Sequence, residues 1–176
     1  MMPSMSIIQA LAEALQQAAT ILPPDVHAAL RAARARETSP MGAAQLDAIL
    51  ENVDIARQGA IPMCQDTGIQ TFFVEAGVQS PFLAELKGWM EEAVRQATAS
   101  IPLRLNTVDP FTGANPGDNS GPGMPPITWD LVDGDEVRIT LLPKGGGSEN
   151  MSALKMLPPG VGLKGIKKAV VQHIVS

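Results

Sequence analysis

The chain has 176 residues, 45% of them hydrophobic and 18% charged, which is the composition of a globular protein and not of a disordered one. Its formal net charge is −5, and no basic cluster is longer than Lys167-Lys168, so nucleic acids and anionic membranes are excluded as expected partners. Residues 1–22 contain no Lys or Arg, and no apolar run approaches the roughly 18 residues of a membrane span. We expect a cytoplasmic protein whose single cysteine, Cys64, stays reduced.

Three helices are predicted within the first 60 residues. Pro23-Pro24 ends the first helix, and the second follows Pro24. Ser39 is a natural N-cap for the third helix, with Pro40 at its first position and Gly59 as its expected stop. Their apolar stripes are formed by Ile7, Ile8, Leu11 and Leu15, then Val26, Leu30 and Ala33, then Leu46, Ile49, Leu50, Val53 and Ala56.

The next elements are a strand, a helix and a long loop. Residues 69–76 are rich in β-forming residues and predict a strand. Ser80-Pro81 is the expected start of a helix. Residues 101–126 are rich in Pro, Gly, Asn and Asp, follow no period, and indicate a long loop of the kind that often carries function. The helix would bury Phe82, Leu86, Trp89, Met90, Ala93 and Ala97.

Residues 127–142 predict two antiparallel strands. Apolar and polar side chains alternate on both sides of the turn pair Asp133-Gly134, as a sheet with one buried face requires. A short amphipathic helix is expected from about Gly165. Together these elements predict an α+β fold, with the N-terminal helices packed on a mixed sheet that contains an antiparallel hairpin, in one domain over residues 1–176.

The first loop that could carry chemistry is Pro62–Gly68. Thiol, amide, carboxylate and hydroxyl groups stand there in consecutive positions, at Cys64, Gln65, Asp66 and Thr67. The loop is either a metal-ligating thiolate beside polar groups that face a substrate, or a turn with a partly buried cysteine. A nucleophilic Cys64 would need a base, usually His, and both histidines of the chain fall in helical segments far from it in sequence.

Two further loops could bind anions. Arg104 stands in the Pro- and Asn-rich loop and can bind a carboxylate through two parallel N–H bonds, or it can be a solvated surface arginine. The segment Lys144–Asn150 holds three consecutive glycines that let backbone N–H groups approach an anion, or it is a flexible glycine turn. Its spacing matches neither a Walker A loop nor a dinucleotide fingerprint.

Four motifs, taken in order, resemble the class I iron–sulfur fumarate hydratase and L-tartrate dehydratase family, α-type part. They are Cys-Gln-Asp-Thr-Gly at 64–68, Pro-Leu-Arg-x-Asn at 102–106, Asn-x-Gly-Asp-Asn at 115–119 and Lys-Gly-Gly-Gly-Ser-Glu-Asn at 144–150. The resemblance implies a [4Fe–4S] cluster held by three cysteines, with Cys64 as the first ligand. It also implies a catalytic role for Asp66 and a substrate-binding set of Gln65, Asp66, Arg104, Lys144, Gly147, Ser148 and Asn150.

The reaction that the resemblance implies is the reversible removal of water from a 2-hydroxy dicarboxylic acid, malate to fumarate or tartrate to oxaloacetate. It also implies a β-type domain or subunit as partner, and an oligomer. One cysteine cannot hold a cluster, and family sequences continue past the helix that matches 165–175 into a Cys-Pro-Pro-type segment. We therefore expect a truncated chain that is inactive alone.

Other readings stay open. The chain could be a degenerate protein that kept its anion-binding loops and lost the metal. It would then be a metal-independent dicarboxylate-binding module that uses Arg104 and residues 144–150. It could also be a purely structural partner of a β-type chain.

Overall fold

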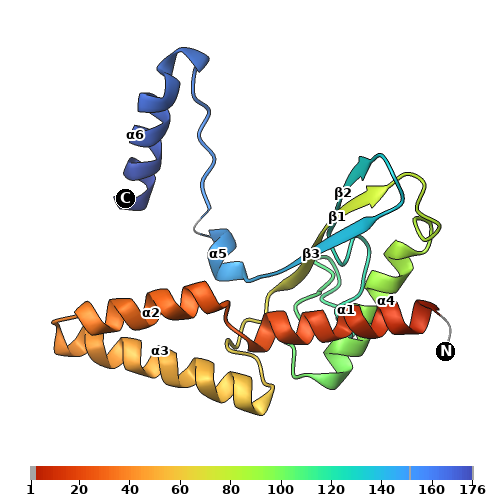
Figure 1. The fold of residues 1–176 in the computed structure, drawn as a ribbon, viewed down its shortest axis with the longest axis horizontal. Coiled ribbons are helices and arrows are strands. Elements are labelled where there is room, and N and C mark those ends of the chain that lie inside the picture. The colour runs from red at the N-terminus through yellow and green to blue at the C-terminus, as the bar shows by residue number, and fades with distance from the viewer. Residues whose placement is uncertain (1–2, 151, 176) are drawn as a thin grey trace. The chain divides into compact units, whose positions relative to one another are not determined.

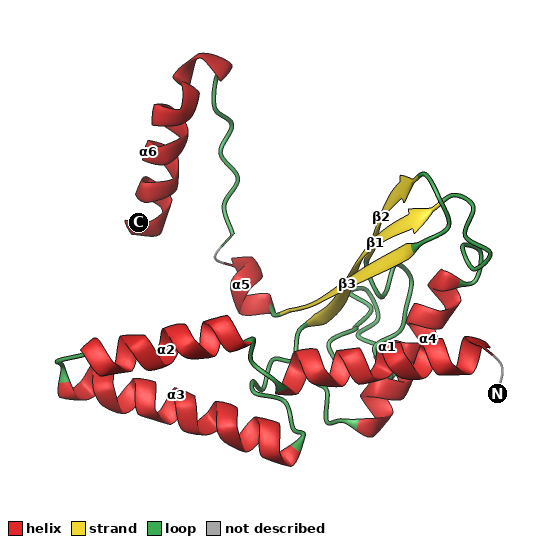
Figure 2. Cartoon of the chain, in the orientation of Figure 1, coloured by secondary structure: helices red, strands yellow, loops and turns green. Residues whose placement is uncertain are grey.

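The computed structural model describes residues 3–150 and 152–175, which divide after Gly145 into two compact units. The first unit holds α1, α2, α3, β1, α4, β2 and β3, and the second holds α5, a 3₁₀ turn and α6 (Figures 1 and 2). Helices combine with a small mixed sheet, so the predicted α+β class is confirmed. The described helices include none with the length and apolar character that crossing a membrane requires.

The three N-terminal helices form where the sequence predicts them. They are α1 (Pro3–Thr20), α2 (Pro24–Arg36) and α3 (Pro40–Gly59). The hydroxyl of Ser39 accepts a hydrogen bond from the backbone N–H of Gly42 at 3.4 Å, and Ala60 ends α3 in the left-handed conformation with φ 50°. α2 and α3 lie antiparallel and side by side (Figure 1), and Arg34 bonds Asp47 across them at 2.7 Å.

The sheet has the strand order β2-β1-β3, so β1 (Ile69–Gly77) is its central strand. β2 (Ile127–Val132) pairs with β1 in parallel, and β3 (Val137–Lys144) pairs with it antiparallel. β2 and β3 run in opposite directions, as the sequence indicates, and are joined by the short connection of residues 133–136. They do not pair with each other, however, because β1 lies between them. The apolar pattern alone does not show which strand takes the centre of a sheet.

Gly77 is what lets the β2–β3 connection pass over the end of β1. Its N–H donates to Glu136 O at 2.8 Å, and the N–H of Gln79 donates to Gly134 O at 2.9 Å. A Cβ atom at residue 77 would collide with the backbone of Gly134 and Asp135. Glycine is therefore required here by close backbone approach and not by an unusual φ angle.

Gly77→Ala should lower the free energy of unfolding by about 3 kcal/mol, because the connection must shift away from the new methyl group. The matched control is Gly88→Ala in α4, where a Cβ would meet nothing within 4 Å. That change should raise stability by about 0.5–1 kcal/mol through helix propensity. Urea titration followed by circular dichroism measures both changes, and an equal, small effect of the two would contradict the packing at Gly77.

One face of the sheet carries the core. Alternate residues of β1 (Phe72, Val74 and Ala76) are at most 2% exposed, and α1 and α4 (Leu86–Ser100) cover them. α4 begins later than Ser80-Pro81, because residues 81–85 form turns first. Phe82 consequently stays 40% exposed, although the prediction had it buried; its ring packs against that of Trp89 with a 5.6 Å centroid separation.

The second unit is small and has no described buried side chain. It consists of α5 (Gly146–Asn150), the 3₁₀ turn Pro159–Val161 and α6 (Gly162–Val175). The glycine segment that the sequence indicates as a loop is therefore mostly a five-residue helix. α6 begins at Gly162, three residues before the predicted start at about Gly165. The prediction of one domain over residues 1–176 stays a prediction.

Candidate functional site

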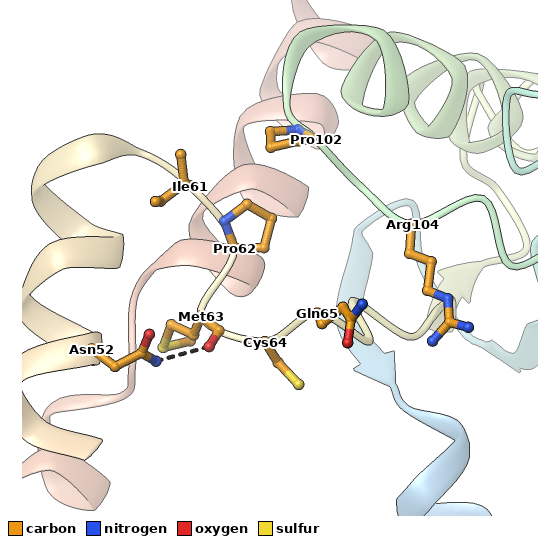
Figure 3. Close-up of a pocket in the computed structure, with 8 residues that line it drawn as sticks. All are labelled: Asn52, Ile61, Pro62, Met63, Cys64, Gln65, Pro102 and Arg104. Atoms are coloured by element: carbon orange, nitrogen blue, oxygen red, sulfur yellow. Dashed lines mark hydrogen bonds between the residues drawn. The ribbon is translucent and has the colours of Figure 1, made fainter. Parts of the chain in front are cut away.

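An open pocket of about 590 Å³ lies in the first unit, between the α3–β1 connection and the start of the 101–126 loop (Figure 3). The sequence-predicted residues Cys64, Gln65 and Arg104 all contribute to it, and their side chains project to the same side in Figure 3. Tertiary structure therefore joins two of the three loops singled out from the sequence. The complete lining is Asn52, Ile61, Pro62, Met63, Cys64, Gln65, Pro102 and Arg104.

Backbone hydrogen bonds hold the segment that carries Cys64. Met63 donates its N–H to Ala19 O at 3.0 Å, at the end of α1. Its carbonyl accepts from the side chain of Asn52, on α3, at 2.8 Å. Both bonds tie the residue before Cys64 to helices, while Cys64 and Gln65 themselves stay exposed. The thiol and the amide are therefore presented to solvent from an anchored loop.

Asp66 turns back onto the loop that follows it. Its Oδ1 accepts from the N–H of Gly68 at 3.1 Å and from Asn106 Nδ2 at 3.3 Å. A Cβ at Gly145 would lie 3.3 Å from Asp66 Oδ2, so the chain just after β3 passes beside this carboxylate. Asp66 is half-buried and is not among the pocket-lining residues. Its carboxylate is thus oriented by the Asn106 amide and a backbone N–H.

Arg104 is held through its backbone and exposes its side chain. Its N–H donates to Thr67 Oγ1 at 2.9 Å, and this bond links the two loops across 37 positions of sequence. Within the described residues, no hydrogen bond or ion pair of the guanidinium is present. An exposed cation that lines a pocket and has no partner among the described residues can pair with an incoming carboxylate.

The other predicted site residues lie at or beyond the end of β3. Lys144 is the last residue of β3, opposite Ile69, and its backbone lies against Gly68. Gly147 and Asn150 are exposed in α5, within the second unit. Ser148 is also in α5, and its side chain lies outside the described residues. Their assignment to the substrate site stays a prediction.

The 101–126 loop is shaped by its own acidic side chains. The pKa of Asp109 is lowered by hydrogen bonds from Thr112 and from the backbone N–H of Phe111. The pKa of Asp118 is lowered chiefly by the Ser120 hydroxyl, at 2.6 Å, and by the Ser120 N–H. Both turns are therefore favoured when these carboxylates are ionised, and this stabilisation is lost as the pH falls through the lowered pKa values.

The donor set does not suit a complete metal cluster. Cys64 is the only cysteine of the sequence. Among the side chains that the structure describes, which do not include Glu149, no group of three or more His, Cys, Asp or Glu residues is arranged to hold a metal ion. A [4Fe–4S] cluster needs several thiolates, so the residues of this chain by themselves do not fit one.

Comparison with known proteins identifies the family. The family model described as fumarate hydratase (Fumerase) matches residues 8–176. The chain belongs to this family. Over 88% of its length it is 39% identical to the L(+)-tartrate dehydratase subunit alpha of Escherichia coli strain UTI89, and 38% identical to that of Shigella sonnei strain Ss046.

An archaeal relative extends the match. A protein of Methanocaldococcus jannaschii, whose name as an L(+)-tartrate dehydratase subunit alpha is itself provisional, is 39% identical over 98% of this chain. The chain spans 62% of that relative's length and 52% of the length of the two bacterial ones. The resemblance seen in the motifs is thereby confirmed at the level of family.

Some residues that build the site carried little signal in the sequence. Asn52 stands in an amphipathic helix, where nothing distinguishes it from other surface residues of α3. In the sequence, Thr67 is only one polar group in a run, and Asn106 and Asn119 are only members of motifs. Their part in holding the loops depends on contacts between segments that are distant in sequence.

Proposed function

We propose that this chain is the α-type portion of a hydro-lyase that reversibly removes water from a 2-hydroxy dicarboxylic acid, malate or tartrate. The observation that carries the proposal is the convergence of Cys64, Gln65 and Arg104 on one pocket in a chain of the fumarate hydratase family. The names of the relatives, tartrate dehydratase alpha subunits, support the reaction class and a β-type partner chain.

The residues of the pocket suit the substrate class. The Arg104 guanidinium would bind one carboxylate of the acid through two parallel N–H bonds. The Gln65 amide offers both a donor and an acceptor to a neighbouring hydroxyl group. Loss of a proton from the carbon beside a carboxylate builds negative charge on that carboxylate, and a paired arginine stabilises it. Binding and charge stabilisation are therefore the tasks we assign to Gln65 and Arg104.

Asp66 is proposed as a catalytic group beside the pocket. Its Oδ1 is oriented by Asn106 and Gly68, while Oδ2 faces the chain near Gly145. A carboxylate that is oriented in this way can accept a hydrogen bond from the substrate hydroxyl or a proton from the substrate. We extend the substrate-binding set to Lys144, Gly147, Ser148 and Asn150 on the strength of the motif alone.

Cys64 is proposed as one thiolate ligand of an iron–sulfur cluster. Because the chain lacks the other ligands, they would have to come from residues outside 1–176. The exposed thiol on an anchored loop supports this assignment, and a reducing, cytoplasmic setting would keep it available. The partner and the oligomeric assembly belong to the same proposal.

A second candidate is a dicarboxylate-binding module that works without metal. It is favoured by one specific observation: the pocket combines Arg104 and Gln65 with a single cysteine. In this case Arg104 would bind the acid, and no dehydration would follow.

Titration calorimetry of the 176-residue chain with L-tartrate or L-malate should show saturable binding. Arg104→Met should weaken it by roughly 10- to 100-fold, because a charge-assisted pair to a carboxylate is lost. Arg57→Met is the matched control. Arg57 is an arginine outside this pocket and is paired with Asp54 at 3.3 Å. Its replacement should therefore change tartrate affinity less than about twofold.

Iron separates the two candidates. Tighter binding after anaerobic reconstitution with iron, sulfide and a β-type chain, together with dehydration of the acid, supports the hydro-lyase. Equal binding with and without iron, and no dehydration, supports the module. Unchanged tartrate affinity in Arg104→Met would contradict the assignment of Arg104 in both candidate functions.

Cys64→Ser tests a purely structural role. If this variant leaves both complex formation and activity intact, the chain is only a structural partner of the β-type chain.

A further inference from the structure

We propose that Asn119 is the positioning residue that sets the direction of Arg104 in the pocket. The inference deepens the proposed function, since it rests on Arg104 as the carboxylate-binding group. Asn119 lies 15 positions beyond Arg104 in the same loop, is 8% exposed and does not line the pocket. It would therefore act through Arg104 without touching the ligand.

The backbone around Arg104 belongs to no helix or strand, yet side chains bind its polar groups in succession. Asn119 Nδ2 donates to Arg104 O at 3.2 Å, and Asn119 Oδ1 accepts from Asn106 N at 2.9 Å. Asn115 Nδ2 donates to Leu105 O at 3.0 Å. Thr67 adds a fourth such bond, to Arg104 N. Side chains thus supply the hydrogen bonds that a neighbouring strand would otherwise have made to this backbone.

Asn119 joins this backbone to a rigid element. Its Nδ2 also donates to Thr98 Oγ1 at 3.2 Å, and the Thr98 hydroxyl donates in turn to Val94 O at 2.8 Å. Both Thr98 and the fully buried Val94 belong to α4, which packs in the core. The amide side chain of Asn119 thus fixes the position of the Arg104 backbone relative to α4.

Only asparagine meets all the requirements at position 119. The residue has φ +59°, a left-handed conformation that Asn tolerates better than most residues with a Cβ. Its amide supplies an acceptor and two N–H donors at once. Aspartate would lose the donors and place a charge against Arg104 O, and glycine would keep the backbone conformation but lose all three bonds.

Arg104 depends on this support because its guanidinium has no partner among the described residues. Figure 3 shows it extended from the loop on the same side as Gln65 and Cys64. The direction of such a side chain follows the orientation of its own Cα–Cβ bond, which the bonds to Arg104 N and O determine. A small rotation of this backbone would move the guanidinium away from a carboxylate bound beside Gln65.

The test uses Asn119→Gly in the full 176-residue chain, with L-tartrate as the probe. We expect tartrate affinity to fall about tenfold, because the guanidinium is misplaced. We also expect faster amide hydrogen exchange at Arg104 and Asn106, and a lower NMR order parameter for Arg104 Nε–Hε. In the Arg104→Met background, Asn119→Gly should cause no further loss of tartrate affinity, since the group that Asn119 positions is gone.

A second pair of variants tests the anchor on α4 without changing residue 119. Thr98→Val removes the acceptor of Asn119 Nδ2 and should weaken tartrate binding about threefold. Thr98→Ser keeps the hydroxyl and should restore wild-type affinity. If Asn119→Gly fails to fold, a Thr98→Val variant that matches wild type in tartrate affinity and in exchange overturns the proposal.

The remaining outcomes are also decisive. An additive loss in the Asn119→Gly, Arg104→Met double variant would overturn the proposal, because it would mean that Asn119 only stabilises the fold. Unchanged exchange and an unchanged Arg104 order parameter in Asn119→Gly would overturn it with or without a ligand. If the wild-type chain does not bind tartrate, the proposed function fails at this step. The exchange and order-parameter measurements then decide the role of Asn119 on their own.

Discussion

Replacing Phe72 by Ala should lower the free energy of unfolding by about 3–5 kcal/mol, the largest single loss that we expect in this chain. Phe72 is fully buried in the central strand β1, where it pairs with Ile127 on one side and Leu141 on the other. It is also the largest of the fully buried side chains. Removing its ring leaves a cavity. Because β1 is hydrogen-bonded to β2 on one edge and to β3 on the other, the strand cannot easily move to close it.

The neighbouring residue provides the control. Phe73 is the same residue type in the same strand but faces the other side of the sheet and is 43% exposed. Phe73→Ala should cost clearly less, about 1–2 kcal/mol, because a large share of its surface stays in water after folding and no closed cavity is left. Urea titration followed by tryptophan fluorescence measures both variants. Equal losses would show that the core does not lie on the α1 and α4 side of the sheet.

Gly68→Ala should lower the free energy of unfolding by about 2–5 kcal/mol, for two reasons that act together. Gly68 has φ +74°, a conformation that costs a residue with a Cβ about 1–2 kcal/mol. In addition, the new Cβ would lie 2.6 Å from the carbonyl carbon of Lys144, and backbone cannot swing aside as a flexible side chain can. Residues 67–69 would therefore have to separate from β3.

Gly113→Ala separates the cost of the positive φ from the cost of the clash with the Lys144 backbone. Gly113 has nearly the same φ, +71°, but a Cβ there would meet nothing within 4 Å. Its loss should be only the conformational part, about 1–2 kcal/mol. Urea titrations of the two variants give the difference, which is the cost of the contact with Lys144. A Gly113→Ala loss as large as that of Gly68→Ala would contradict this close approach.

The site should respond to Gly68→Ala as well. The N–H of Gly68 donates to Asp66 Oδ1, and Gly68 O accepts from Asn106 Nδ2 at 3.1 Å. A shift of this backbone therefore moves the proposed catalytic carboxylate and the loop of Arg104 together. Gly68 therefore permits the close packing against β3 and also keeps Asp66 and Asn106 in place.

Much of the fold could be read from local patterns. α1 ends shortly before Pro23-Pro24, and α3 begins after the Ser39 cap and ends at Gly59, as predicted, because helix boundaries depend on groups within a few residues. α4 starts later than Ser80-Pro81 predicts, because Ser80-Pro81 is also a good turn sequence and the turn prevails there. Local rules identify candidate boundaries, but they do not choose between two that are equally well formed.

The candidate site was predictable as a set of residue types and not as an arrangement. Cys64, Gln65 and Arg104 stood out because polar, reactive groups in Pro- and Gly-rich segments have no structural period that explains them. That Asn106 would bind Asp66, 40 positions earlier, could not be foreseen. A side-chain amide can serve many partners, and which one it meets depends on how distant segments pack.

The sequence by itself determined the family, most of the helix and strand segments, and the residues whose chemistry suits a dicarboxylate, because these depend on local patterns and on motif order. Tertiary structure alone decided that β1 lies between β2 and β3, that Gly77 and Gly68 stand at backbone crossings, and that Asn119 links the loop of Arg104 to α4. Each of these depends on contacts between residues far apart in the chain. Such contacts form only where packing brings the segments together, so no local pattern records them.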